Sequence, residues 1–188
     1  GLLYAKTAKG ILNSIDVTPA LSIPGVVDVY TSQDLQQNIW GPIFHDQPLI
    51  VEREIGFYGE VLAVIAAESH EAIEQAKQAI VVDIEALTPL FTIDEAKQQN
   101  AFIGDTRHIE RGDVDGVFAQ ATHRLSGTFR CNGQDHFYLE SQAAIVYPKE
   151  QGQLEVHASS QHPTETQHLV AEALGLGFHQ VVCIVKRM

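Results

Sequence analysis

The sequence predicts a protein of the α+β class, and three observations indicate this. The run at 61–67 is apolar and rich in strand formers, yet much shorter than the roughly 20 apolar residues that cross a bilayer. Apolar residues recur with helical spacing at 72–80 and 163–174. Apolar residues make up 45% of the 188 residues and charged residues 19%, which is typical of a folded globular chain.

The first strands and helix are marked by local signals. Residues 10–17 and 26–30 have strand character. Between them, we expect Thr18 to cap a short helix in which Pro19 takes the first position. Pro24-Gly25 would end that helix.

The clearest unit follows a long loop over 36–60 that leads to an edge strand. It consists of the strand 61–67, a helix capped by Ser69 with its apolar face over 72–80, and a strand at 81–84. A strand–helix–strand unit of this length favours a crossover connection. An antiparallel α+β arrangement is the alternative.

A change in composition marks the predicted domain boundary. Thr92 and Glu95 match a capping box, which starts a short helix over the next few residues. The segment 100–116 is then polar and holds two Gly-Asp pairs. We therefore divide the chain into a first domain over 1–107 and a second part over 108–188.

The second part is expected to hold two helices and several strands. A short helix covers 114–121, and a longer one begins at Pro163 and ends at Gly175. The last strand shows no turn after it, which suggests a chain that has been cut short. The strands are placed at 123–130, 143–147, 154–158 and 181–188.

Charge and cysteine content exclude several classes of partner. Twelve basic and 24 acidic residues give a formal net charge of −12, so nucleic acid and anionic membranes would be repelled. The N-terminus lacks the pattern of a signal peptide. Cys131 and Cys183 lie far apart, whereas an iron–sulfur site or a disulfide framework would need more cysteines at close spacing. We expect a reduced, cytoplasmic protein.

Nine histidines are unusual beside two cysteines, but their spacing does not predict a metal site. A zinc-binding helix places two histidines four residues apart, whereas His162 and His168 are six apart and do not share a helix face. We expect individual histidines to lie in polar networks or at helix ends. We assign no metal ligand and no self-contained catalytic constellation to the chain.

Two polar segments differ from ordinary core. Gly133–Glu140 fits neither helical nor strand spacing, and indicates either a hydrogen-bonded loop under a site or a buried structural network. Residues 158–163 lie where a strand ends and a helix begins, a position that presents free N–H groups to oxo or anionic ligands. Gln161 donates there without adding charge. The alternative is that Gln161 caps the helix.

These two segments resemble the molybdenum-binding subunit of the xanthine dehydrogenases, especially the bacterial type, in which that subunit is a separate chain. The resemblance covers nearly all 188 residues. Two positions depart from the family pattern: Asp135 replaces the usual Glu, and Ser160 replaces the usual Thr. The further motifs that carry the resemblance are Ser14-Ile15-Asp16, Pro24-Gly25-Val26, Phe57-Tyr58-Gly59-Glu60, Arg111-Gly112-Asp113 and Val185-Lys186-Arg187-Met188.

The resemblance implies an α/β-hammerhead domain over 1–107, followed by the truncated start of a molybdopterin-binding domain. Gln161 matches the family glutamine that hydrogen-bonds the apical oxo group of molybdenum. Ile43 and Phe44 fall near the wall of the substrate funnel. The glycine-rich loop and the catalytic glutamate of the family lie outside this sequence, so the resemblance assigns no catalytic residue here.

The resemblance also implies a reaction. The family hydroxylates hypoxanthine and xanthine to urate in purine catabolism, and passes electrons through 2Fe–2S clusters and FAD to NAD. Those groups lie on other domains or on a partner subunit in a hetero-oligomer, and the fragment alone is expected to be inactive and free of cofactor. The alternatives are an aldehyde oxidase-type molybdenum hydroxylase and a non-catalytic binding module with the hammerhead fold.

Overall fold

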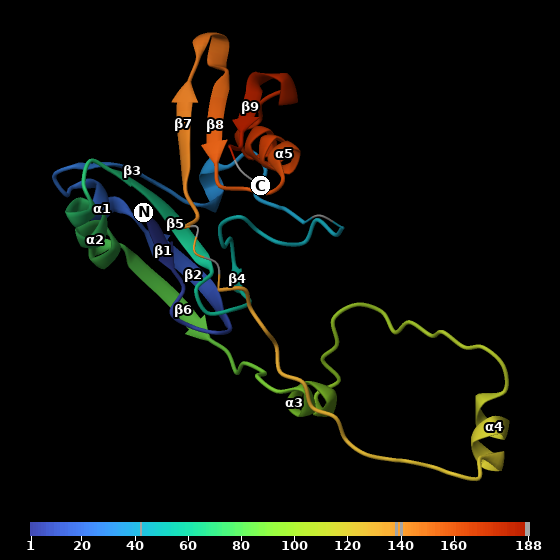
Figure 1. The fold of residues 1–188 in the computed structure, drawn as a ribbon. Coiled ribbons are helices and arrows are strands. Elements are labelled where there is room, and N and C mark those ends of the chain that lie inside the picture. Colours follow the sequence, from blue (N-terminus) through green and yellow to red (C-terminus); the bar gives the residue numbers. More distant parts are fainter. Residues whose placement is uncertain (42, 138, 140, 187–188) are drawn as a thin grey trace. The chain divides into compact units, whose positions relative to one another are not determined.

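The computed structural model describes residues 1–41, 43–137, 139 and 141–186 (Figure 1). By internal contacts, the chain divides into two compact units. One unit combines residues 1–89 with the described residues that follow 140, and the other is the segment 90–139. Among the described residues, no helix is long and apolar enough to cross a membrane.

The first sheet has the order β1-β5-β3, and both of its strand pairs are antiparallel. Its strands are β1 (Leu2–Tyr4), β5 (Val61–Ala67) and β3 (Val26–Tyr30). The helix α2 (His70–Ala79) follows β5 and is capped by Ser69, whose Oγ accepts from the Ala72 amide at 3.2 Å, as predicted. The buried core of this layer is formed by Ala20, Val29, Ala63, Ile65, Ala76 and Ile80.

The second sheet has the order β4-β2-β6 and is also antiparallel, with β4 at one edge. The predicted crossover is therefore wrong, because β5 and β6 lie in different sheets. The physical reason is visible in β6, where exposed and half-buried residues alternate, as in an antiparallel strand with one face toward water. The strands are β4 (Glu54–Ile55), β2 (Gly10–Asp16) and β6 (Val81–Ala86).

The first helix, α1 (Thr18–Leu21), begins differently from the prediction. Thr18 lies inside the helix rather than at its cap, because the carboxylate of Asp16 accepts from the Thr18 amide at 2.9 Å. Hydrogen bonds from the Thr18 side chain and then from its amide hold the pKa of Asp16 below its usual value. Gly25 follows with a φ of 86°, a conformation that glycine adopts at little cost.

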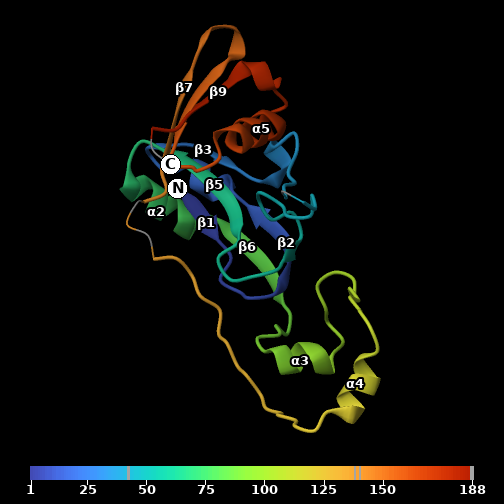
Figure 2. The ribbon, with the colours of Figure 1, turned by 45° about the vertical axis from the view of Figure 1, so that its right-hand side comes forward.

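The third sheet carries the candidate site. The pair β7 (Ala144–Pro148) and β8 (Leu154–Ala158) is antiparallel, and β9 (Val181–Ile184) runs parallel to β8. The connection from β8 to β9 is the helix α5 (Pro163–Leu174), which lies beside this sheet in both views (Figures 1 and 2). Its buried contact with the sheet is formed by Val156, Ala171 and Val181.

Both ends of this β8-α5-β9 unit compare directly with the sequence expectations. Gly175 ends α5 in the left-handed conformation, with a φ of 68°, as predicted. The last strand ends at Ile184, so the predicted strand at 181–188 is too long where the structure describes it. Arg187 and Met188 lie outside the described residues. Short 3-10 helices lie elsewhere among the described residues, at Ser32–Asp34 after β3 and at Glu150–Gly152 between β7 and β8, while Phe178–Gln180 directly precedes β9.

The segment 90–139 contains two short helices, α3 (Ile93–Gln98) and α4 (Val114–Gln120). The predicted capping box is present, because Thr92 Oγ1 accepts from the Glu95 amide at 3.1 Å and the Glu95 carboxylate accepts from the Thr92 amide at 3.0 Å. The predicted strand at 123–130 is wrong. No described strand pairs with it, and Figure 1 draws it as an irregular trace. Its large apolar side chains, Leu125 and Phe129, are exposed.

Candidate functional site

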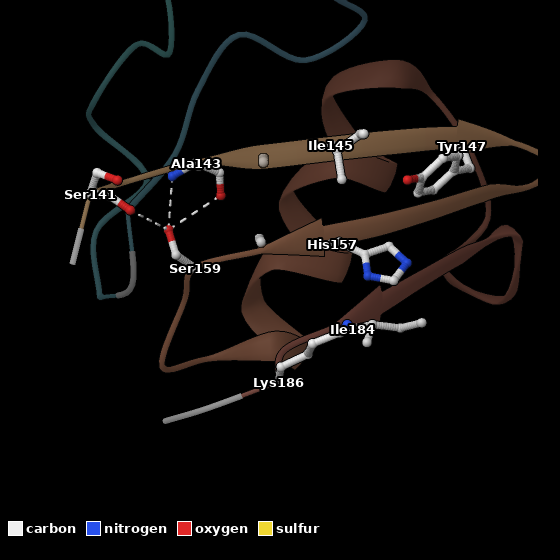
Figure 3. A pocket seen from close by; sticks show the side chains of 10 residues that line it. Ser141, Ala143, Ile145, Tyr147, His157, Ser159, Ile184 and Lys186 are labelled. Carbon is white, nitrogen blue, oxygen red and sulfur yellow. Dashed lines mark hydrogen bonds between the residues drawn. The ribbon is translucent and has the colours of Figure 1, made fainter.

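The candidate site is the loop Ser159–His162, which connects β8 to α5. Ser159 fixes the start of this loop against β7 (Figure 3). Its Oγ accepts from the Ala143 amide at 2.8 Å, and lies 3.3 Å from the Ser141 carbonyl oxygen and 3.2 Å from that of Ala143. The Ser159 amide also donates to the Ala143 carbonyl at 3.0 Å. The loop therefore begins from a well-anchored position.

Ser160 folds back toward the first turns of α5. Its Oγ accepts from the His162 amide at 3.1 Å and lies 3.1 Å from Thr166 Oγ1. Thr166 Oγ1 also lies 3.1 Å from the His162 carbonyl oxygen. Two hydroxyl groups therefore join the loop to the helix that it starts.

His162 is the N-cap of α5. Its Nδ1 accepts from the Glu165 amide at 3.1 Å, which satisfies one of the free N–H groups of the first helical turn. An accepting nitrogen carries no proton, so this contact uses the neutral imidazole. The interpretation of Gln161 as the helix cap is therefore wrong.

Gln161 differs from its neighbours in the loop, because its side chain has no hydrogen bond to a described residue. The residue is exposed, and its amide forms no hydrogen bond with any residue that the structure describes. The side chains on both sides of it are held by the contacts given above. The loop thus presents one neutral amide, able to donate and to accept, at a strand end beside a helix N-terminus.

The sheet face opposite α5 carries a charged cluster. Glu155 contacts His157 Nε2 at 2.9 Å and Lys149 Nζ at 3.1 Å. The hydrogen bonds from His157 and then Lys149 hold the pKa of the Glu155 carboxyl below its usual value. Tyr147 meets the His157 ring edge-on, with 5.5 Å between the ring centroids.

An open cavity of about 640 Å³ lies on this face (Figure 3). Figure 3 shows Ser159 at one end of its lining and Tyr147 at the other. Gln161 does not line it, and neither do Ile43 and Phe44. The lining residues are Ser141, Ala143, Ala144, Ile145, Tyr147, His157, Ala158, Ser159, Ile184 and Lys186.

Ile43 and Phe44 lie in a hairpin of the long loop. Its base is closed by Trp40 and Gln47, whose backbones exchange hydrogen bonds of 2.6 and 2.8 Å. Ile43 is 82% exposed and Phe44 is 67% exposed. Pro42 lies outside the described residues. The hairpin presents an apolar surface to solvent.

Among its described residues, the segment Gly133–Glu140 forms neither the hydrogen-bonded loop nor the buried network that its composition indicated. Where described, it is exposed, with Phe137 and Leu139 at 101% and 100%. A hydrogen bond within it is local, from the His136 amide to the Asp135 carboxylate at 2.8 Å. Tyr138 and Glu140 lie outside the described residues.

Several histidines occupy the kinds of position that the sequence predicts. His162 lies at a helix end, while His157 and His108 each contact a glutamate, Glu155 and Glu110, at 2.9 and 2.8 Å. Within the described part of the chain, no group of three or more His, Cys, Asp or Glu residues is arranged to hold a metal ion.

Two roles in the loop were missed by the sequence reasoning. Pro163 at the first helical position makes the preceding residue, His162, the cap position, and this signal was available. The contact of Thr166 with Ser160 joins residues six positions apart across a loop, and no short-range sequence pattern predicts it.

Comparison with known proteins identifies the family. The sequence model of the aldehyde oxidase and xanthine dehydrogenase a/b hammerhead domain matches residues 1–88, and that of the molybdopterin cofactor-binding domain matches 93–188. The chain belongs to the aldehyde oxidase and xanthine dehydrogenase family. This confirms the resemblance drawn from the sequence. The first two sheets lie in the hammerhead region, and the third sheet with Gln161 lies in the molybdopterin cofactor-binding region.

Individual members of the aldehyde oxidase and xanthine dehydrogenase family are similar over most of the chain. Xanthine dehydrogenase of Blastobotrys adeninivorans is 39% identical over 93% of this chain and 13% of its own length. Aldehyde oxidase 1 of Oryctolagus cuniculus is 37% identical, with the same coverage of each chain. Aldehyde oxidoreductase from Desulfovibrio gigas has the same fold, with a TM-score of 0.83 at 24% identity over 98% of this chain and 22% of that chain. The chain spans 13–14% of the length of the curated relatives it matches.

Proposed function

We propose that the chain is part of a cytoplasmic molybdenum hydroxylase that oxidises hypoxanthine and xanthine to urate in purine catabolism. The support is the similarity of nearly the whole chain to curated xanthine dehydrogenases, at up to 39% identity. In the bacterial arrangement, the electrons leave through 2Fe–2S clusters and FAD on another subunit and reach NAD. The division into domains at 107/108 belongs to the same proposal, and the 188-residue segment alone is inactive.

The observation that carries the proposal is Gln161, a neutral amide without a hydrogen bond to any described residue, on a loop whose other side chains are held. This donor fits an oxygen of a bound molybdenum cofactor, because it gives a hydrogen bond without introducing a charge that would change the redox balance. The cofactor, when bound, supplies the two-electron oxidation chemistry. Gln161 orients and polarises that oxygen through its Nε2–H group.

Ile43 and Phe44 have a separate role in the proposal. Two large apolar side chains on a hairpin suit one wall of the channel through which a planar purine enters. Their exposure, 82% and 67%, leaves their apolar surface available for this contact. Neither residue takes part in bond making.

The proposal is tested by Gln161→Ala in the full-length protein that contains this chain. Removing a residue that supports a metal centre from outside its ligands typically costs about 10- to 100-fold in activity or metal affinity. Turnover of xanthine should fall by that order, with unchanged iron–sulfur content and unchanged secondary structure by circular dichroism. The matched control is Gln153→Ala, an exposed glutamine at the other end of β8. Unchanged kinetics for Gln161→Ala would remove Gln161 from the site.

Aldehyde oxidation is the second candidate, and the 37% identity to an aldehyde oxidase is the observation that favours it. Measuring kcat/KM for xanthine and for an aromatic aldehyde in the full-length protein separates the two. A non-catalytic binding module is the third candidate. A content of one molybdenum atom per full-length chain, measured by inductively coupled plasma mass spectrometry, would exclude a non-catalytic module.

A further inference from the structure

We propose that Thr166 is a positioning residue for the reaction, because its hydroxyl group holds the loop from which Gln161 projects. This inference rests on the proposed function of Gln161.

The contacts of Thr166 bracket Gln161. Its Oγ1 lies 3.1 Å from Ser160 Oγ and 3.1 Å from the His162 carbonyl oxygen. These atoms belong to the residues immediately before and after Gln161. Since Gln161 has no hydrogen bond to a described residue, the backbone of its two neighbours sets the direction in which its side chain leaves the loop.

The number of hydroxyl protons determines which group donates in each of these hydrogen bonds. Each hydroxyl carries a single proton. The contacts with Ser160 Oγ and with the His162 carbonyl oxygen are both hydrogen bonds only when Ser160 donates to Thr166 Oγ1 and Thr166 donates to the carbonyl. The Thr166 side chain also has a hydrogen-bonding contact with the Cys183 thiol, which is itself a weak donor. Ser160 Oγ then accepts from the His162 amide at 3.1 Å. The three residues form one connected chain of hydrogen bonds around Gln161.

The helix that carries Thr166 is itself held in place. The neighbouring Gln167 donates through its Nε2 to the carbonyl oxygens of Phe178 at 2.9 Å and Val181 at 2.7 Å. Ala171, fully buried, packs on Val181 and Val156. Thr166 is therefore a fixed point relative to the third sheet, and the hydrogen bonds transfer that rigidity to the loop.

A purely structural role for Thr166 predicts different behaviour. If the hydroxyl only stabilised the start of α5, its loss would affect the protein in the same way whether or not residue 161 was a glutamine. If it positions Gln161, the loss matters for catalysis only while the amide is present. A double-mutant cycle distinguishes these cases.

The experiment compares Thr166→Val with Thr166→Ser in the full-length protein. Valine keeps the branched shape and removes the hydroxyl, while serine keeps the hydroxyl. We expect kcat for xanthine to fall about 5- to 10-fold in Thr166→Val, as for the loss of one to two modest hydrogen bonds, with KM within about twofold. Thr166→Ser should stay within about twofold of the parent. Thr164→Val, at an exposed threonine in the first turn of α5, is the matched control and should have no effect.

The readout independent of activity is amide hydrogen exchange over residues 160–166. It should be about tenfold faster in Thr166→Val, with or without bound cofactor, and unchanged in Thr166→Ser. Ser160→Ala removes the other end of the same contact and should reproduce both effects. Ser160→Ala takes the place of Thr166→Val in the test if Thr166→Val does not fold.

Each outcome decides the question. In the Gln161→Ala background, Thr166→Val should lower kcat no further, and an equal additional loss would show a structural role and overturn the inference. Normal kcat in Thr166→Val beside a defective Gln161→Ala would also overturn it, while leaving the proposed function intact. Normal kcat in Gln161→Ala itself would refute the role of Gln161 and with it the role of Thr166.

Discussion

Replacement of His162 tests which residue caps α5, and the structure sets the expected magnitude. His162→Ala removes the Nδ1 acceptor of the Glu165 amide and leaves that N–H group without its protein partner. Loss of an N-cap side chain costs about 0.5–2 kcal/mol. If the first turn of α5 opens locally, amide exchange at Glu165 and its neighbours should accelerate about 2- to 30-fold, since RT is about 0.59 kcal/mol.

The assay is hydrogen–deuterium exchange read by mass spectrometry on peptides that cover residues 160–170 of the full-length protein. His162→Asn should restore slow exchange, because asparagine is among the best N-cap residues and is neutral like the imidazole that it replaces. Gln161→Ala is the internal control and should exchange like the parent. Fast exchange in Gln161→Ala together with slow exchange in His162→Ala would refute the assignment of His162 as the cap.

Two further predictions concern the third sheet. Gly175→Ala places a side chain at a φ of 68° and should destabilise the C-terminal end of α5 by about 1–2 kcal/mol, measured as faster amide exchange over residues 170–176. Gly175→Asn should cost less, because asparagine tolerates the left-handed conformation better than alanine does. Equal exchange in the two variants would contradict this prediction. Contacts with His157 and Lys149 lower the pKa of Glu155, so the stability they contribute is present above its usual value of 4.5 and is lost as pH falls below it. Between pH 6 and pH 4, roughly spanning that value, the thermal midpoint should therefore fall more in the parent than in Glu155→Gln; parallel curves would contradict the coupling.

Local features of the fold were predictable from the sequence because their causes are local. The boundaries of α5 follow from Pro163 at its start and Gly175 at its end, and both signals act within a few residues. The capping box of Thr92 and Glu95 and the cap at Ser69 are of the same kind. In each case, the side chain that determines the structure lies within one helical turn of the backbone group it satisfies.

Strand pairing was harder to predict because it depends on partners far along the chain. The residues of β6 form a strand as expected, but their pairing with β2 rather than β5 is decided across more than sixty residues of sequence. The segment 123–130 shows the opposite case, in which strand-forming residues find no partner among those described and remain exposed. Composition indicates that a segment is able to pair, and the rest of the protein determines whether it does.

The sequence predicted the position of Gln161 in the candidate site, but not the hydrogen bonds of the residues around it. The position of Gln161 between a strand and a helix follows from short-range signals. The cap at His162 was detectable from Pro163, whereas the hydroxyl contacts of Ser160 and Thr166 required the three-dimensional arrangement. The candidate channel residues Ile43 and Phe44 came from the family resemblance, because an exposed apolar pair carries no signal of its own.

The side chain of Gln161 has no hydrogen bond to a described residue, so its proposed role in the reaction is separate from any role in holding the loop. Hydrogen bonds elsewhere in the loop maintain its shape, so under the proposed role of Gln161 we expect another polar side chain at this position to change the reaction rather than the yield of folded protein. A saturation library at this position, with Ser160, His162 and Thr166 unchanged, would therefore sample donor strength and charge at nearly constant stability. Such a position lets a family diversify its reactivity without first acquiring compensating mutations.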